Sequence, residues 1–209
     1  MKTNIWLLAV VSLLVSPVAS WAEESASTVE LAVAAYDADS SELIPDPVVR
    51  YYREEYRPDE QHQIHVPLTI KEHGTFIIVS AKGYTSRRIS WRATNPAEYP
   101  ASYKVSMTKG AKIGGQVVDE KGQPVAGATV SILGDRPDRS VEAPAFEDRA
   151  YMTTERVTTD AEGRWSFGEF PPEKTAVKLR IDGAGLTNFV DLPATDLLSA
   201  NHVHTLKAE

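Results

Sequence analysis

The chain has no cysteine among its 209 residues, and this absence removes several options at once. It allows no disulfide, no thiolate metal ligand and no thiol nucleophile, so stability has to come from apolar cores. The signatures of other hydrolases are missing too. There is no G-x-S-x-G segment for a nucleophilic serine and no H-x-x-E pair for a zinc peptidase. We therefore predict a protein that is not an enzyme and that needs no cofactor.

Positive charge is also in short supply, because the formal net charge is −7 with both signs mixed along the chain. A mildly acidic chain lacks the basic stripe by which proteins bind nucleic acid or anionic lipid, so we expect neither partner. Long apolar runs are missing after the N-terminus. The only one is Ile5–Val15, which is too short to span a bilayer comfortably.

That run has the features of a secretory signal peptide. Lys2 precedes it, and Ser20 and Ala22 place small residues at the third-last and last positions before a cleavage site. We predict a signal peptide at residues 1–22, a mobile tail at 23–28 and an exported mature protein, periplasmic or extracellular. After signal removal we expect no membrane insertion.

The rest of the chain lacks a sustained helical stripe, and its apolar residues alternate with polar ones. Val177, Leu179 and Ile181 can face a core while Lys178 and Arg180 face water. Short segments of this kind, separated by 13 prolines and 12 glycines across the whole chain, predict antiparallel β-sandwiches. The expected strands are 30–36, 48–52, 64–70, 75–81, 87–91, 103–107, 113–118, 128–133, 156–159, 164–167, 176–182, 188–192 and 202–207.

Two halves of this pattern follow each other in the same order. We align Asp37 with Asp119, Ile44 with Val125, Val49 with Val130 and Tyr51 with Ile132, and we align 73–84 with 162–170 followed by 176–185. The prediction is an all-β protein with two tandem sandwiches, at 29–109 and 113–209, joined by a short linker near 109–112. Two long loops, 53–63 and 134–155, stand out; the second is either functional or disordered.

Two turns in the second half have a shared pattern, Asp119–Gly122 and Asp160–Gly163. An aspartate at the first position of a type I turn accepts bonds from backbone N–H groups two residues on, and a glycine at the fourth takes positive φ at little cost. We expect Asp119, Gly122, Asp160 and Gly163 to be structural turn residues.

These turns, within IGGQVVDEKGQPVAGATVSI and TTDAEGRWSFGEFPP, resemble the carboxypeptidase regulatory-like domain family. The resemblance is clear in the C-terminal half and weak in the N-terminal half, where IPDP stands in place of VAGA. It implies a prealbumin-like, immunoglobulin-like sandwich. It implies little about function, because such domains are accessory modules on proteins of many kinds.

Several residues could still carry a binding function. His202 and His204 lie two apart on an expected strand and could give zinc two ligands, although a third is missing. Asp37 and Asp39 offer alternate oxygen ligands for calcium, although a plain polar turn explains them as well.

Exposed aromatic rings in the first half could stack on sugars or bind a protein. Tyr51 and Tyr52 must point to opposite faces of a strand, so at least one should lie outside the core. We therefore expect a non-catalytic binding or structural module of the cell envelope with a protein or carbohydrate partner. The alternative is a carrier of a small ligand or of calcium or zinc.

Overall fold

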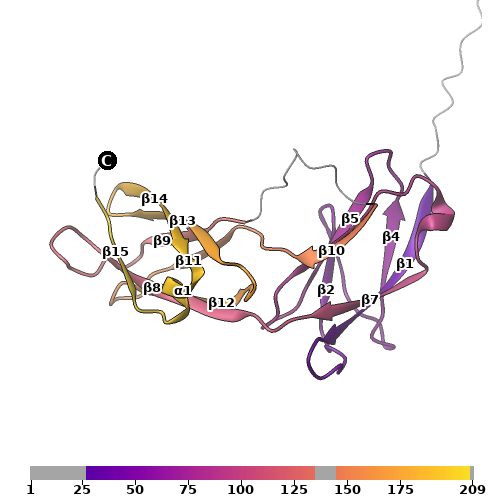
Figure 1. Ribbon diagram of the computed structural model, residues 1–209, viewed down its shortest axis with the longest axis horizontal. Helices are drawn as coiled ribbons and strands as arrows, with labels where there is room; N and C mark the ends of the chain where they lie inside the picture. The colour runs from indigo at the N-terminus through magenta and orange to yellow at the C-terminus, as the bar shows by residue number, and fades with distance from the viewer. Residues whose placement is uncertain (1–26, 135–144, 208–209) are drawn as a thin grey trace, which may run out of the picture.

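The computed structural model describes residues 27–134 and 145–207. Figure 1 shows an elongated molecule in which two β-rich units follow each other end to end. Each unit consists of two sheets with its own buried apolar cluster between them. The prediction of an all-β protein with two tandem sandwiches is confirmed. Residues 1–22, with the expected signal peptide, lie outside the described part of the chain, as do residues 23–26 of the expected tail.

The first unit uses the strands of the N-terminal half. One sheet has the order β4-β1-β7, and the other contains β6, β5, β2 and β3 side by side. Alternate residues of β1, β4 and β5 are fully buried, which is the period-two pattern of a strand with one face on a core. The elements are β1 (Thr28–Asp37), β2 (Val48–Tyr51), β3 (Glu54–Tyr56), β4 (Ile64–Thr69), β5 (Thr75–Ser80), β6 (Arg87–Trp91), the 3-10 helix η1 (Pro96–Glu98) and β7 (Ser102–Met107).

The second unit has the sheet orders β11-β9-β13-β14 and β12-β8-β15. Val177, Leu179 and Ile181 of β13 are at most 1% exposed, as their alternation predicted. The elements are β8 (Ala111–Val118), β9 (Thr129–Ile132), β11 (Glu155–Thr158), β12 (Arg164–Phe170), β13 (Ala176–Gly183), β14 (Leu186–Pro193), α1 (Ala194–Leu198) and β15 (His202–Thr205).

The two units share one plan. In each three-stranded sheet the first strand of the unit lies in the middle, antiparallel to one neighbour and parallel to the last strand of the unit. The turn after that first strand is also matched. Ile44 N donates to Ala35 O and Val125 N donates to Val117 O, both at 2.9 Å, so Ile44 and Val125 are equivalent. One part of our alignment is wrong. The sheet orders make β5 equivalent to β13, and β4 is the strand equivalent to β12, so 73–84 does not match 162–170.

One strand crosses from the second half to the first. β10 (Phe146–Ala150) belongs to the segment 134–155, yet it pairs antiparallel with β6 and becomes the fifth strand of the first unit's sheet. Figure 1 shows β10 among the strands of the first unit, away from its sequence neighbours. The sequence predicted a loop here, and residues 135–144 of that loop lie outside the described part. The domain boundary near 109–113 remains a prediction. β10 crosses it, because it follows this boundary in the sequence but pairs with β6 of the first unit.

Three smaller features differ from the expectation. Thr28, which we placed in the tail, is the first residue of β1 and pairs with Thr69. Glu54–Tyr56, which we placed in a loop, forms the edge strand β3. α1 spans only five residues, so it is too short to show a helical stripe in the sequence. Across residues 27–134 and 145–207, neither short helix has the length or apolar character to cross a membrane.

Candidate functional site

The two aspartate turns of the second half use their carboxylates within the turn. Asp119 Oδ1 accepts from the N–H groups of Lys121 and Gln123 at 2.9 and 2.8 Å. Asp160 Oδ1 accepts from Glu162 and Arg164 in the same way, at 3.1 and 2.8 Å. Gly122 and Gly163 have φ of +77° and +71°, as a glycine at this position of the turn predicted. A purely structural role for the four residues stays a prediction.

The first unit contains the same turn, which sequence reasoning missed. Asp59 Oδ1 accepts from the N–H groups of Gln61 and Gln63, both at 2.9 Å, just before β4. His62 stands at the glycine position with φ of +60°. The equivalence to Asp160 was hidden because no glycine marks the turn. The remaining signal was an aspartate four residues before the polar residue that precedes the strand, as Asp59 stands before Gln63 and β4.

The calcium candidates Asp37 and Asp39 do not form an oxygen cage. Asp37 is only 5% exposed, and its Oδ1 accepts from the N–H groups of Asp39 and Ser40. Its Oδ2 accepts from the Tyr84 hydroxyl at 2.9 Å and lies 3.4 Å from Lys109 Nζ. The bond from Ser40 is the largest of the contributions that hold the pKa of Asp37 well below its usual value. Both carboxylate oxygens are therefore already used by donors.

The zinc candidates His202 and His204 lie on β15, next to β8. His204 Nε2 is 3.2 Å from Asn188 Oδ1, and the Asn188 amide nitrogen donates to Lys207 O. Nε2 therefore donates a proton to Asn188 and cannot ligate a metal in this arrangement. Burial, reinforced by the charges of His202 and Lys207, lowers the pKa of His204. Within the described ranges no group of three potential ligands gathers around a common point.

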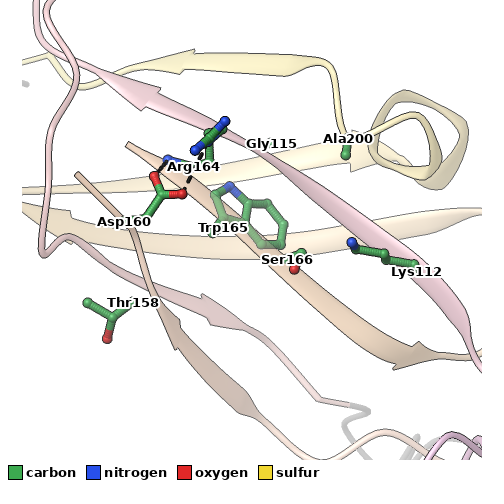
Figure 2. Close-up of a pocket in the computed structure, with 8 residues that line it drawn as sticks. All are labelled: Lys112, Gly115, Thr158, Asp160, Arg164, Trp165, Ser166 and Ala200. Atoms are coloured by element: carbon green, nitrogen blue, oxygen red, sulfur yellow. Dashed lines mark hydrogen bonds and ion pairs between the residues drawn. The ribbon is translucent and has the colours of Figure 1, made fainter. Parts of the chain in front are cut away.

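A shallow cavity of about 410 Å³ lies on the second unit beside Trp165. Figure 2 shows that Asp160 and Arg164 pair at one end of it, with Asp160 Oδ2 3.1 Å from Arg164 Nε. Lys112 lies toward the opposite end, and the Trp165 ring lies between them. Trp165 is only 6% exposed, so it offers little surface to a ligand. These side chains do not converge on one point, as a catalytic or ligand-binding group would require.

A larger groove, of about 720 Å³, lies on the first unit where β2 and β3 of one sheet approach β4 of the other. We call it the Tyr52 groove. Its walls are mostly aromatic and apolar, with Tyr51, Tyr52, Arg53, Tyr56, Pro67 and Phe76 among them. Tyr52 is 52% exposed and Phe76 is 39% exposed. By contrast, two other aromatic residues of the first unit, Trp91 and Tyr99, are buried in the core, so not every ring of this unit is available for binding.

Backbone conformation places the Tyr52 ring in this groove. Tyr52 has φ of +54°, a left-handed conformation that is unfavourable for a bulky residue. We expected Tyr51 and Tyr52 to point to opposite faces. One is buried and the other exposed, but their ring centroids are only 4.4 Å apart, because Tyr52 lies just beyond the end of β2. Tyr52 is the first of the two residues that join β2 to β3, where a tight hairpin turn takes positive φ, and the turn holds the half-exposed ring in the groove. The groove is the leading candidate site because it gathers this ring with other aromatic side chains.

A cationic side chain lies over each of two exposed rings of the groove. Lys71 Nζ lies 4.3 Å from the centre of the Tyr52 ring, and the Arg88 guanidinium lies 4.4 Å from that of Phe76. Glu54 lines the groove too, but it accepts a 2.5 Å bond from the Tyr56 hydroxyl, which raises the pKa of Tyr56 to about 12. In the described part of the chain, Lys71, Arg88 and Arg53 make no ion pair with a carboxylate. The groove is thus aromatic, with Arg53 and Glu54 in its lining and Lys71 and Arg88 over two of its rings.

Solved structures with a similar arrangement include three pilus proteins. A streptococcal ancillary pilin is 11% identical, with a TM-score of 0.33 over 86% of this chain and 62% of that chain, so this chain spans less than two thirds of it. The shaft pilin SpaA from Lactobacillus rhamnosus GG is 12% identical (TM-score 0.31, 87% and 97%). RrgB from Streptococcus pneumoniae is 12% identical (TM-score 0.30, 88% and 47%). Similarity this weak transfers no function or residue role to this chain.

No curated protein matches the chain. A family model does match the second half, where the turns at Asp119 and Asp160 flank β8, β9 and β12. The match confirms the resemblance that the sequence predicted for this half: residues 112–203 are similar to the carboxypeptidase regulatory-like domain.

Proposed function

We propose that this protein is a non-catalytic, exported binding module of the cell envelope, and that the Tyr52 groove is its binding surface. The observation that carries the proposal is the half-exposed Tyr52 in an aromatic groove of about 720 Å³. Export is inferred from residues 1–22 alone. Sequencing the N-terminus of the secreted protein should find Glu23 first, and a protein retained in a membrane fraction with Met1 would contradict this.

The partner that fits this groove best is an acidic segment of another protein. A sugar stacks on the free face of an aromatic ring, but Lys71 covers Tyr52 and Arg88 covers Phe76. Those cations, together with Arg53, offer positive charge to carboxylates beside an apolar floor. Polypeptide and carbohydrate are both partners that the sequence leaves open, and the positions of these cations favour the polypeptide.

The test uses a short polyglutamate peptide as the probe. The unaltered chain should bind it, and binding should weaken as salt rises, because exposed charges are screened. The double variant Lys71→Glu with Arg53→Glu should lose this binding. The matched control, Lys82→Glu with Lys121→Glu, makes the same charge change at two exposed lysines outside the groove and should leave binding intact.

A neutral oligosaccharide panel provides the opposing outcome. If a neutral oligosaccharide binds, survives Lys71→Glu and is lost in Tyr52→Ala, the groove is a carbohydrate site and the acidic-peptide proposal is wrong. Failure of the unaltered chain to bind polyglutamate even at low salt would also contradict it.

A further inference from the structure

The edge of β6 is occupied by a strand that the first unit does not encode. β10 pairs with it over five positions, from Phe146 opposite Trp91 to Ala150 opposite Arg87. Backbone bonds extend the pairing at both ends, from Arg92 N to Ala145 O and from Tyr151 N to Ser86 O, each 2.8 Å long. The first unit therefore has a backbone edge that is satisfied only by a strand added from outside its own sequence.

Side chains of the first unit recognise that strand specifically. Asp148 points inward, and its carboxylate accepts from Arg87 Nε at 2.9 Å and from the Tyr103 hydroxyl at 2.8 Å. Two residues earlier, the Phe146 ring packs against Trp91 and Tyr103, with centroids 6.0 and 5.7 Å apart. An aromatic residue and an aspartate at alternate positions of β10 thus contact side chains of the first unit beside the β6 edge. This is the pattern of strand addition, in which the backbone gives affinity and alternate side chains give specificity.

The second unit does not use β10 in its own sheets. Its strands close into β11-β9-β13-β14 and β12-β8-β15 without it. β10 is therefore available for donation without the loss of a strand from the unit that carries it. The first unit, by contrast, would leave the β6 edge, Trp91 and Arg87 uncovered if β10 departed.

A short junction decides which copy receives the strand. Residues 108–110 connect β7 to β8, and Gly110 N donates to Gly83 O at 3.0 Å. Gly83 N in turn donates to Glu169 Oε1 at 3.1 Å, which ties the two units together beside this linker. These contacts hold the two units together at the junction, and in this arrangement β10 lies on its own β6. If they open, each chain presents one vacant acceptor edge and one unpaired donor strand.

We propose that the β6 edge is a strand-binding site that takes β10 from a second copy of this chain as well as from its own. The contacts are identical in the two cases, so the balance depends on concentration. A short tether gives the internal strand an effective concentration in the millimolar range. Exchange between copies is therefore expected when the junction is transiently opened at high protein concentration, as in other exchanges of an identical element.

Single cysteines test the exchange cleanly, because the chain has none of its own. Ser90 and Glu147 are opposite residues of β6 and β10. Cross-strand spacing lies within disulfide range. A chain with Ser90→Cys is mixed with one carrying Glu147→Cys at high concentration, opened in mild denaturant, returned to native buffer and oxidised. The control replaces the second chain by Glu120→Cys, an exposed position in the Asp119 turn.

Exchange predicts a disulfide-linked heterodimer on a non-reducing gel, about tenfold more abundant than in the control and rising with protein concentration. Adding Asp148→Ala to the donor chain should reduce it severalfold. A heterodimer yield equal to the control at every concentration would overturn the proposal.

A second experiment places both cysteines in one chain. The double variant Ser90→Cys with Glu147→Cys, oxidised when dilute, should form an internal disulfide and then fail to exchange. Absence of that internal disulfide would also overturn it, because β10 would not lie on β6.

Discussion

The two units share one strand arrangement but differ in the residues at their turns and in the edge of one sheet. The second unit places glycine at the positive-φ position of both of its aspartate turns, whereas the first places Ser41 and His62 there, with φ of +58° and +60°. The second unit ends its four-stranded sheet at β14, whereas the first extends the equivalent edge, β6, with β10. The first unit therefore keeps the backbone geometry with less favourable residues and depends on a strand from its neighbour.

This difference explains where the family pattern is readable. A turn motif can be read from sequence only when the residue that relieves its strain is present, and the second unit has that residue in both turns. In the first unit the bonds to Asp37 and Asp59 hold the turns without a glycine.

The largest effect is expected from Gly163→Ala. Gly163 combines φ of +71° with close packing, because an added Cβ would lie 2.4 Å from Val117 O. We expect a loss of about 3 kcal/mol in the free energy of unfolding, measured by urea denaturation. Gly122→Ala is the control, because Gly122 has φ of +77° but open space around its Cβ position. It should lose only about 1 kcal/mol. Equal losses would show that packing at Gly163 does not matter.

Asp148→Ala should destabilise the first unit by about 2 kcal/mol, because it leaves Arg87 and the Tyr103 hydroxyl without their shared acceptor. The Arg87 and Asp148 side chains are 21% and 16% exposed, so water replaces the lost bonds only in part. Hydrogen exchange of the β6 amides would measure the change locally. Asp191→Ala is the control: its pair with Lys178 is about 70% exposed on both sides, so it should change stability by less than about 0.5 kcal/mol.

His62→Gly and Ser41→Gly should each stabilise the protein, by about 0.5 kcal/mol. Glycine removes the steric cost of positive φ, and its greater freedom in the unfolded chain offsets part of that gain. Thermal melting of each variant measures the change. Gln61→Gly, in the same turn as His62 but without positive φ, should destabilise slightly. If His62→Gly also destabilised, the turns of the first unit would not be under the strain we infer.

The smallest expected effect is on how the stability of the protein depends on pH. The pKa of Asp37 is held well below its ordinary value of 3.8, mainly by the N–H of Ser40 and the Tyr84 hydroxyl. A carboxylate with a depressed pKa adds stability above its unfolded pKa, and this is lost as pH falls through that value toward the folded pKa. Asp37→Asn should therefore flatten the decline in melting temperature below about pH 4. An unchanged slope would contradict a stabilising role for the Asp37 carboxylate.

The sequence predicts the strands that bury one face, because their alternation is local information. It cannot predict β10, because the inward-facing residues of FEDRA include Asp148, which fits the core only through Arg87 and Tyr103, more than forty residues away. β3 is too short to show a period. The sequence predicted that Tyr51 or Tyr52 is exposed and could bind a partner, but it did not predict the groove that gathers these rings. Tyr52 is the first of the two residues that join β2 to β3, a position where a tight hairpin turn takes positive φ, and a tyrosine there gives no sign of that turn in the sequence.

β10 also changes how the molecule responds to bending. Two units joined by a single short linker can rotate relative to each other about that linker. Here residues 108–110 form one connection, and the β10–β6 ladder forms a second beside it. Because the units are attached at two separate places, a large rotation of one against the other requires hydrogen bonds between β10 and β6 to break. Movement of one unit against the other is therefore resisted at two places along the chain.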